Sequence, residues 1–550
     1  MSLSNEQILL LENLAYLEPG VDSSVRDISG YENRTVGDWL DNVSVDPAYR
    51  DYTNGEEWNN ILTAARKDPT IMNMKIVDTH IDNAPGGGGG KSVVFVSQEQ
   101  GEAVVAFKGT AAKEWKDDFI GGNRVSTPQQ DNALKWYQDT YRENGLDQYS
   151  VTVTGHSKGG NKAKYITVMD DTVDRCVSFD GQGFSDQFIE KYHDQIAVNQ
   201  GKITNINAED DYVNILLNDI GKTEFYKAYN TEGDFLQNHC PDAIMDFDED
   251  GNFTLHLSPD GQGKEVKALD EFLNSCIRSM PEEDRDDALM LFGTLMEEKD
   301  ALGRMSGDEA KDFILDLMTD PQYADNVAYV AAFFLMYEQA HPEFGEEIRD
   351  LLGEYGMGEF VQYVDVLDSL VNMEIDLGWF GTLHLNDIIG LAAGIGGALP
   401  DWAWDKILDE IEKNTGVRLT VEQVRGLLSI AGMTADYMGK VNVNVSGKDK
   451  KVDSVTPGPG KSDFMILPGI AQIAVANMEA CARRVLKVAD DVDAVVNGLD
   501  DRAYGGVRWN IRRYSHQLDA TGAVMREMRS SLETIVKKYR QTEQIVQSKR

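Results

Sequence analysis

The segment SVTVTGHSKGGNKAKYITVM, residues 150–169, constrains the fold of this chain more than any other. Its alternating β-branched residues before Gly155 are typical of a buried strand, and a helix-forming stretch begins at Lys158. Ser157 therefore lies where a strand turns abruptly into a helix, with a glycine two residues away on each side. Glycines let such a strained turn close without a clash of Cβ atoms. The turn needs a sheet beneath it and a helix packed on that sheet.

Strands and helices alternate on both sides of this turn. The pattern predicts strands at 91–98, 102–109, 149–154, 174–183 and 201–211, helices at 130–144, 158–169 and 184–194, and a last hairpin at 243–257. Such alternation is typical of an α/β domain with a mostly parallel sheet. We expect this domain to cover residues 1–265.

The rest of the chain has a different pattern. Residues 266–440 are almost wholly helical, and residues 441–462 are polar and rich in proline and glycine, as in a linker. Two long helical stretches in residues 463–550 predict a helical hairpin. The expected fold is thus an α/β domain followed by an all-α region and a C-terminal helical hairpin.

Charge separates these parts and excludes one class of partner. The chain has a net charge of −41, but residues 463–550 hold 14 Lys and Arg against 11 Asp and Glu, which leaves −44 for residues 1–462. Nucleic-acid binding needs clustered Lys and Arg, so we expect no nucleic-acid partner. The four cysteines lie far apart without a Cys-x-x-Cys pair, so neither a disulfide framework nor a zinc site is expected.

No targeting or membrane-spanning segment is evident in the sequence. The start, MSLSNEQILLLENLAYLE, lacks a basic region and a cleavage site and predicts an amphipathic helix. No apolar run reaches the roughly 18–20 residues that a spanning helix needs. We expect the apolar stretches at 326–337 and 387–400 to be buried in the core. Export would therefore not use a standard signal peptide.

A serine at such a turn becomes a nucleophile when a histidine accepts its proton and an acid orients the histidine. On this kind of turn the acid and the histidine follow the serine in chain order. The strand at 201–211 ends in acids, and we assign Asp211 as the orienting acid, with Asp210 and Glu209 as register alternatives. His239 follows 28 residues after Asp211 in a predicted loop, and we assign it as the base.

The same chemistry needs two N–H donors for the negative charge that develops on the substrate oxygen. The backbone N–H of Lys158, at the start of the helix, is the first expected donor. The second should come from a loop after an earlier strand, where the sequence VVAFKGT offers Gly109 and Thr110. No metal ion or organic cofactor takes part in this chemistry.

Four motifs in order resemble one known family. AFKGTAAKEWKDDF, the GHSKG turn, VSFDGQGFS and NAEDDYV together look like the lipase class 3 group of α/β-hydrolases and its bacterial lipase-like relatives, over roughly residues 1–260. The resemblance implies a triad of Ser157, Asp211 and His239, oxyanion donors at Thr110 and Lys158, and lipid esters, including phospholipids, as substrates.

The chain departs from the motifs of that family at three places. Lys108 stands where the family usually has arginine, Trp115 is displaced, and no proline follows the DYV segment. These departures leave the triad positions intact. They concern the substrate, which does not carry over as directly as the catalytic residues.

The C-terminal segment carries a second resemblance. Trp509 lies in the turn GGVRW between two helical stretches, and Tyr539 and Glu543 stand four apart on one helical face. These features resemble the small helical substrates of bacterial type VII secretion, although here the turn is inverted and the module is C-terminal. The resemblance implies a bacterial protein exported from the cytoplasm, small helical partners that bind residues 463–550, and an immunity protein.

Other candidate sites have simpler interpretations. His156, next to the serine, is expected to pack inside the turn and not to act as the base. DFDEDGNF, residues 246–253, imitates a calcium loop, but Leu257 stands where the loop needs a bidentate glutamate, so a hairpin turn is expected. The acids of residues 281–287 are expected to be a solvated helix start.

These features together predict a serine esterase of lipase type that is exported as an effector or toxin. Two alternatives remain open. The chain could be a non-catalytic binding or scaffold protein on a degenerate hydrolase fold, or an intracellular esterase or lysophospholipase. An active serine nucleophile would separate the first alternative from the enzymes.

Overall fold

A computed structural model describes most of the chain up to residue 443. The described residues are 2–18, 25–51, 53–84, 89–110, 115–229, 235–302, 307–320, 322–342, 345–353, 358–376, 382–384, 388, 399, 401–441 and 443. The chain divides into two units, Met1–Pro457 and Gly458–Arg550. The expected hairpin at 463–550, nearly all of the expected linker, and most of the apolar stretch at 387–400 lie outside the described residues.

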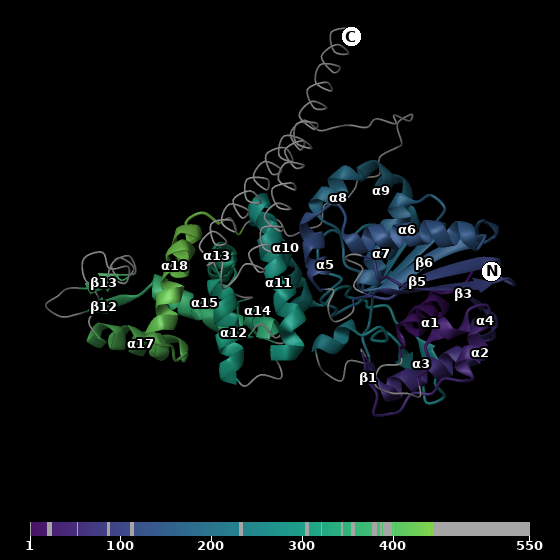
Figure 1. The fold of residues 1–550 in the computed structure, drawn as a ribbon, viewed down its shortest axis with the longest axis horizontal. Helices are drawn as coiled ribbons and strands as arrows, with labels where there is room; N and C mark the ends of the chain where they lie inside the picture. The colour runs from purple at the N-terminus through teal and green to yellow at the C-terminus, as the bar shows by residue number, and fades with distance from the viewer. Residues whose placement is uncertain are drawn as a thin grey trace, which may run out of the picture. The chain divides into compact units, whose positions relative to one another are not determined.

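The first part of the chain, here named the sheet region (residues up to 263), contains a seven-stranded sheet of order β3-β4-β5-β6-β7-β8-β9 (Figure 1). Strands β3 to β5 pair antiparallel, and β5 to β9 pair parallel. The strands are β3 (Lys75–Ile81), β4 (Lys91–Ser97), β5 (Glu102–Phe107), β6 (Ser150–His156), β7 (Arg175–Phe179), β8 (Ile203–Ala208) and β9 (Lys222–Tyr226). The predicted α/β class with a mostly parallel sheet is confirmed.

The two edge strands are the ones that the sequence patterns do not predict. β4 to β8 match the five predicted strands, whereas β3 and β9 each contain several polar, partly exposed residues. An edge strand pairs on one side only and is incompletely buried, so its apolar pattern is weak.

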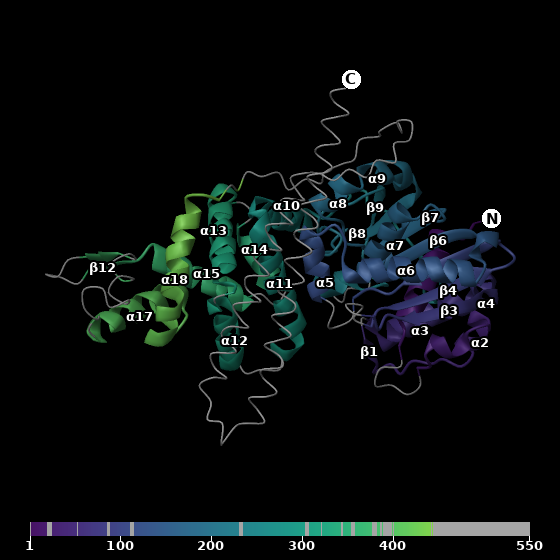
Figure 2. The same ribbon diagram turned by 45° about the horizontal axis from the view of Figure 1, so that its top comes forward.

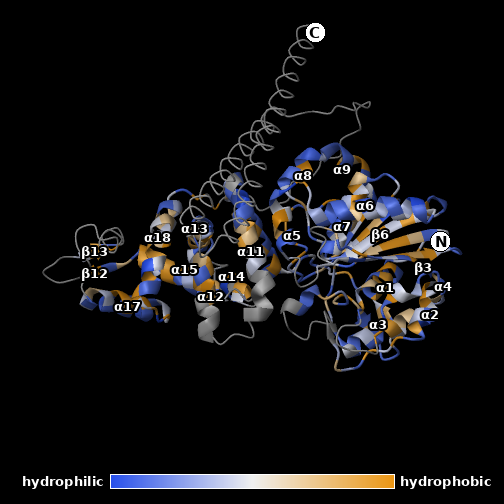
Figure 3. Cartoon of the chain, viewed as in Figure 1, coloured by the Kyte–Doolittle hydropathy of each residue, from blue (hydrophilic) through white to orange (hydrophobic). Residues whose placement is uncertain are grey.

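Helices cover both faces of the sheet (Figures 1 and 2). In β4, Val94 and Val96 pack into one core, while Val93 and Phe95 pack into the other, so the centre of the strand is apolar on both faces. Hydrophobic residues are also visible along the sheet around β6 (Figure 3). One layer contains α6 (Pro128–Glu143), α7 (Lys158–Met169), α8 (Asp186–Lys191) and α9 (His193–Asn199), and the other contains α1 (Asn5–Tyr16), α2 (Val36–Leu40), α3 (Gly55–Lys67) and α4 (Pro69–Asn73). Shorter elements are β1 (Arg50–Asp51), β2 (Thr53–Asn54), α5 (Trp115–Ile120) and the 3-10 helices η1 (Ile28–Tyr31), η2 (Gly121–Asn123), η3 (Leu146–Gln148), η4 (Gln200–Lys202) and η5 (Phe235–His239).

The segment that imitates a calcium loop is a hairpin, as predicted. Strands β10 (Asp246–Phe247) and β11 (Phe253–Thr254) pair antiparallel around it. The Asp248 carboxylate accepts hydrogen bonds from the backbone N–H groups of Asp250 and Asn252 within the turn. This carboxylate therefore serves the turn itself.

The second part, here named the helical region (residues 264–438), is confirmed as almost wholly α-helical. Its helices are α10 (Lys264–Ser279), α11 (Glu282–Leu302), α12 (Gly307–Thr319), α13 (Ala324–Ala340), α14 (Gly345–Leu352), α15 (Gly358–Val371), α17 (Asp401–Thr415) and α18 (Val421–Met438). A short antiparallel pair, β12 (Glu374–Asp376) with β13 (Thr382–His384), also lies here and is not predicted by the sequence patterns. These strands are three residues long, which is too short for a detectable alternation.

The apolar helix α13 lies in the core of the helical region. Its residues from Asn326 to Leu335 are all buried, and most of them belong to one hydrophobic cluster with residues of α10, α15 and α18. This agrees with the expected core role of the stretch at 326–337. In the part of the chain that the structure describes, no helix has both the length and the apolar character to cross a membrane.

Two of the contacts between the helical region and the sheet region lie close to the loop after β8 and to α5. Helix α11 crosses α5 so closely that a Cβ atom at Gly293 would lie 2.8 Å from the Cα atom of Lys116. From α10, Asn274 donates to the Ile215 carbonyl (2.8 Å) and accepts from the Leu217 N–H (2.9 Å). This amide therefore fixes α10 to the loop that follows β8.

A carboxylate on the same helix should make stability depend on pH. Partial burial raises the pKa of Asp270 to about 6, although the Asn274 amide donates to it (2.6 Å). The folded protein then binds more protons than the unfolded chain between about pH 4 and 6, so stability falls as pH rises through this range. We expect Asp270→Asn to be more stable than wild type by about 1–2 kcal/mol at pH 8 and nearly equal to it at pH 4.

Urea unfolding at the two pH values measures this difference. Glu265→Gln makes the same chemical change at an exposed position of α10 and serves as the control. An Asp270→Asn effect of equal size at both pH values would contradict the prediction.

Candidate active site

The turn between β6 and α7 has the strained geometry that the sequence predicts. Ser157 has φ 60° and ψ −128°, a conformation that is costly for a residue with a side chain. A Cβ atom at Gly155 would lie 2.3 Å from the carbonyl carbon of Gly159, and one at Gly159 would lie 1.9 Å from the Phe107 oxygen. Both glycines are therefore required for β5, β6 and α7 to approach one another.

Asp211, assigned as the acid, is fully buried in the loop after β8. One carboxylate oxygen accepts from the backbone N–H groups of Val213 (2.8 Å) and Asn214 (2.7 Å), and the other contacts Nδ1 of His239. The carboxylate is thus held in one orientation and receives a hydrogen bond from the imidazole. Of the two register alternatives, Asp210 lies against Gly263 instead.

His239, at the end of η5, stands beside the serine turn. Its ring lies 4.5 Å from the ring of His156, the residue that precedes Ser157, and 5.4 Å from the ring of Tyr212. With Nδ1 directed at Asp211, Nε2 is the remaining nitrogen, and it is buried without a hydrogen-bond partner in the described part of the chain. The structure therefore brings the segments of all three assigned residues together at the carboxyl edge of the sheet.

His156 is a packing residue, in agreement with the sequence analysis. Burial, together with the nearby His239, lowers the pKa of His156 well below its ordinary value, so this ring stays neutral. Its Nδ1 lies 2.8 Å from the Tyr16 hydroxyl. A neutral, fixed ring supports the turn without competing for the proton of the serine.

Tyr16, at the end of α1, is a residue of this site that the sequence analysis missed. Its hydroxyl accepts a hydrogen bond from the N–H of Gly109 (2.9 Å) and contacts His156. A Cβ atom at Gly109 would lie 2.3 Å from this hydroxyl and 2.9 Å from Cβ of Ser157. The loop that leads to Thr110 is therefore pressed against the serine and held there by Tyr16.

The two expected oxyanion donors lie on this loop and on the first turn of α7. Lys158 is the first residue of α7, so its N–H has no acceptor within the helix. The Thr110 hydroxyl donates to Asp118 of α5 (2.6 Å). The fixed side chain of Thr110 restrains the backbone that would supply the second donor.

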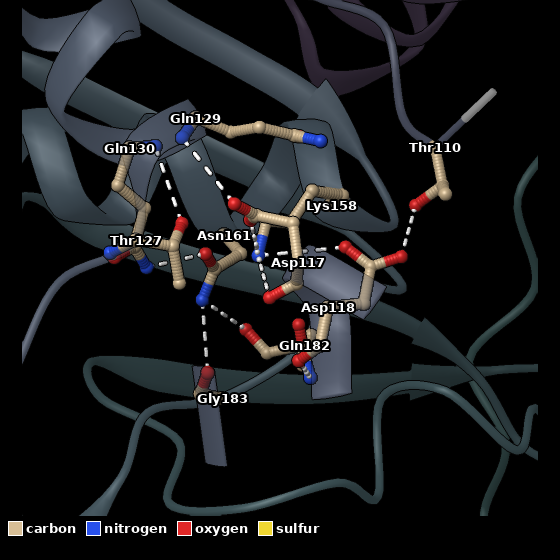
Figure 4. Close-up of polar contacts among 10 residues, drawn as sticks. All are labelled: Thr110, Asp117, Asp118, Thr127, Gln129, Gln130, Lys158, Asn161, Gln182 and Gly183. Carbon is tan, nitrogen blue, oxygen red and sulfur yellow. Dashed lines mark hydrogen bonds and ion pairs between the residues drawn. The ribbon is translucent and has the colours of Figure 1, made fainter. Parts of the chain in front are cut away.

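The side chain of Lys158 belongs to a buried polar network that fixes α5 on α7 (Figure 4). Its ammonium group lies 2.9 Å from a carboxylate oxygen of Asp117 and 3.4 Å from one of Asp118. Burial acts to lower the pKa of Lys158, but these two carboxylates outweigh it and the pKa is raised. Gln182 adds a hydrogen bond to the Asp118 carbonyl (2.9 Å). The lysine therefore acts structurally through its side chain.

Two further buried acids lie close to the site. Asp180, at the end of β7, has φ 46° and accepts from the Ala208 N–H (2.7 Å). Burial and the charge of Asp211 raise the pKa of Asp180 well above its ordinary value, and burial likewise raises the pKa of Glu12. Both carboxyl groups are therefore harder to ionise than exposed ones.

Part of the chain is similar to a known protein family. Residues 90–292 match the family model described as Mbeg1-like, a lipase-like family. The sheet region resembles the lipase-like α/β-hydrolases. This agrees with the strand order, with the serine at the tip of the turn after β6, and with the helices on both faces. The likeness to lipases that the motifs imply is supported for this part of the chain.

Individual relatives are distant. Among solved structures, the Lip2 lipase from Yarrowia lipolytica is 12% identical, with 47% of this chain and 84% of that chain covered and a TM-score of 0.27. The fold is described here from its own strand order. No curated protein matches the sequence.

Loss of the Tyr16 hydroxyl should weaken the fold at the serine turn. Tyr16→Phe leaves the buried N–H of Gly109 and Nδ1 of His156 without this partner. We expect a loss of about 1–3 kcal/mol in the free energy of unfolding, measured by urea denaturation. Tyr229→Phe removes a hydroxyl at an exposed position and should change it by less than about 0.5 kcal/mol. Equal losses in the free energy of unfolding for the two variants would be evidence against the supporting role of the Tyr16 hydroxyl.

Removal of the buried lysine should have a larger, pH-dependent effect. Lys158→Met keeps the side-chain volume but leaves two buried carboxylates without their cation, which should cost about 3–5 kcal/mol at pH 8. Protonation relieves this cost, and burial already raises the pKa of Asp118, so the deficit should shrink at pH 5. Thermal and urea unfolding at both pH values measure it, with Lys135→Met on the exposed face of α6 as the control. A loss of stability in Lys158→Met that is larger at pH 5 than at pH 8 would contradict this prediction.

Proposed function

We propose that this protein is a serine hydrolase of carboxylic esters that uses Ser157, His239 and Asp211 as its catalytic triad. The main support is the position of His239. Its Nδ1 contacts the Asp211 carboxylate, and its ring packs against His156, the residue before the strained Ser157. A strained serine beside an oriented imidazole is the arrangement that activates a hydroxyl nucleophile.

The reaction proceeds in two acyl-transfer steps. Nε2 of His239 accepts the hydroxyl proton as Oγ of Ser157 attacks the ester carbonyl carbon, and a tetrahedral oxyanion forms. His239 then donates that proton to the leaving alcohol, and the acyl group remains bonded to Oγ. Water, activated by the same imidazole, attacks the acyl-enzyme and releases the carboxylic acid.

The other residues lower the barrier through fixed charge and fixed N–H groups. Asp211 stabilises the imidazolium ion and keeps the proton on Nδ1 of His239. The N–H groups of Lys158 and Thr110 bind the oxyanion, with the loop of Thr110 held by Tyr16 and Asp118. Donors fixed in advance need no reorganisation when charge develops on the substrate oxygen.

On the basis of the resemblance to lipase class 3, we propose lipid esters, including phospholipid acyl esters, as the substrates. We further propose that residues 463–550 bind small helical partners and lead to type VII-like export of a bacterial effector that has an immunity protein. The contrast between +3 in this segment and −44 in the rest of the chain supports a separate role for it. Deletion of residues 463–550 should abolish export and partner capture, while ester hydrolysis persists; unchanged export would end this part of the proposal.

The proposed nucleophile can be tested directly. Ser157→Ala should lower kcat/KM for p-nitrophenyl butyrate by at least about 10⁴-fold and abolish labelling by a fluorophosphonate probe. Asp211→Asn should lower kcat by about 10⁴-fold, because the imidazole then loses its preferred tautomer. Ser150→Ala, at the opposite end of β6, is the matched control and should keep both activities.

The outcomes separate the enzyme from a binding or scaffold protein. Equal hydrolysis by wild type and Ser157→Ala would reject the triad. A folded wild-type protein that neither hydrolyses esters nor reacts with the probe would favour a non-catalytic role.

A further inference from the structure

An apolar cavity of about 100 Å³ lies between the sheet region and the helical region. The side chains of α5 and of the loop after β8 form one side, and those of α10, α11, α13, α14 and α15 form the other. No polar surface faces the cavity. A polar group placed there would lose its hydrogen bonds to water without replacement, so the cavity suits hydrocarbon alone.

One wall of the cavity begins at the proposed acid. Tyr212 and Val213, which line the cavity, directly follow Asp211 in the chain. The Val213 N–H donates to the Asp211 carboxylate (2.8 Å), and the Tyr212 ring lies 5.4 Å from the His239 ring. Two residues of the cavity wall are therefore in contact with the groups that orient the imidazole.

A second wall begins at the proposed oxyanion loop. Trp115 and Phe119 of α5 line the cavity, and Asp118 of the same helix accepts the hydrogen bond of the Thr110 hydroxyl (Figure 4). Lys158 of α7 fixes α5 through its ion pairs with Asp117 and Asp118. The same helix thus carries both an apolar wall and the support of the oxyanion loop.

The helical region supplies the remaining walls through rigid contacts. Cys276, Val330 and Phe334 line this side, and Asn274, on the helix of Cys276, is hydrogen-bonded to the loop after β8. Phe272 and Phe334 pack edge to face with ring centroids 5.6 Å apart. The elements that line the cavity are therefore in direct contact with one another.

We infer that this cavity binds the acyl chain of the ester substrate, so that the helical region sets acyl-chain specificity. The inference rests on the proposed function. It assigns the helical region a part in substrate binding and assigns the scissile ester to the edge of the sheet. The leaving alcohol, whatever its headgroup, would lie outside the cavity, because no polar surface faces it.

The size of the cavity limits the length of chain that it can recognise. An apolar cavity of about 150 Å³ accommodates benzene, so about 100 Å³ has room for roughly four methylene groups. Each methylene that leaves water for such a site should raise kcat/KM about fourfold. The value of kcat/KM should therefore increase with acyl-chain length over roughly four methylene groups and then level off.

A series of p-nitrophenyl esters from acetate to decanoate, each below its micelle concentration, measures this profile. Val330→Phe fills the cavity and should lower the ratio of kcat/KM for decanoate to that for acetate by at least about tenfold. Phe334→Leu enlarges the cavity and should move the plateau to longer chains. Val421→Phe repeats the first substitution at a half-buried position of α18 that does not line the cavity, and it should leave the profile of wild type.

Labelling of Ser157 by a fluorophosphonate probe shows that each variant is folded and distinguishes the two possible failures. A flat chain-length profile with Ser157-dependent acetate hydrolysis would overturn the cavity assignment and leave the proposed function standing. Shifts of Val330→Phe and Phe334→Leu in the same direction would also overturn it, because general loosening of the core would produce them. Absence of both labelling and hydrolysis in wild type would reject the proposed function and the inference together.

Discussion

The close approach of three backbone segments at the carboxyl edge of the sheet is the constraint on which the rest of the molecule depends. Gly159 lies where any Cβ atom would meet the Phe107 carbonyl, and Gly109 lies against Ser157. With β5, β6 and α7 packed this tightly, the serine is left in a strained conformation that the surrounding core has to hold. Tyr16 and the buried Lys158 supply that support from the two sides of the sheet.

Three buried carboxyl groups at or near the imidazole have different surroundings. The Asp211 carboxylate accepts hydrogen bonds from two backbone N–H groups and contacts His239, whereas burial raises the pKa of Glu12 and Asp180. A second carboxylate anion close to Asp211 would compete for the same proton and weaken its hold on the imidazole.

The helical region packs directly on two elements of the sheet region. Asn274 fixes α10 to the loop after β8, and Gly293 lets α11 pack directly on α5. These are the same two elements that carry the proposed acid and support the proposed oxyanion loop. Changes in the packing of the helices would therefore reach the proposed site through these direct contacts.

Local patterns in the sequence determined the alternation of strands and helices and the turn at Ser157, because each depends on neighbouring residues. The choice of Asp211 over Asp210 and Glu209 as the partner of His239 depended on how the loop after β8 turns, which no local pattern specifies. Tyr16 meets Gly109 across 93 residues and Asn274 meets Ile215 across 59 residues, and neither contact has a periodic signal. The edge strands, the raised pKa values of Glu12 and Asp180, and the apolar cavity likewise arose only in the tertiary structure. Strand pairing, burial and cavities exist only once distant segments have packed together.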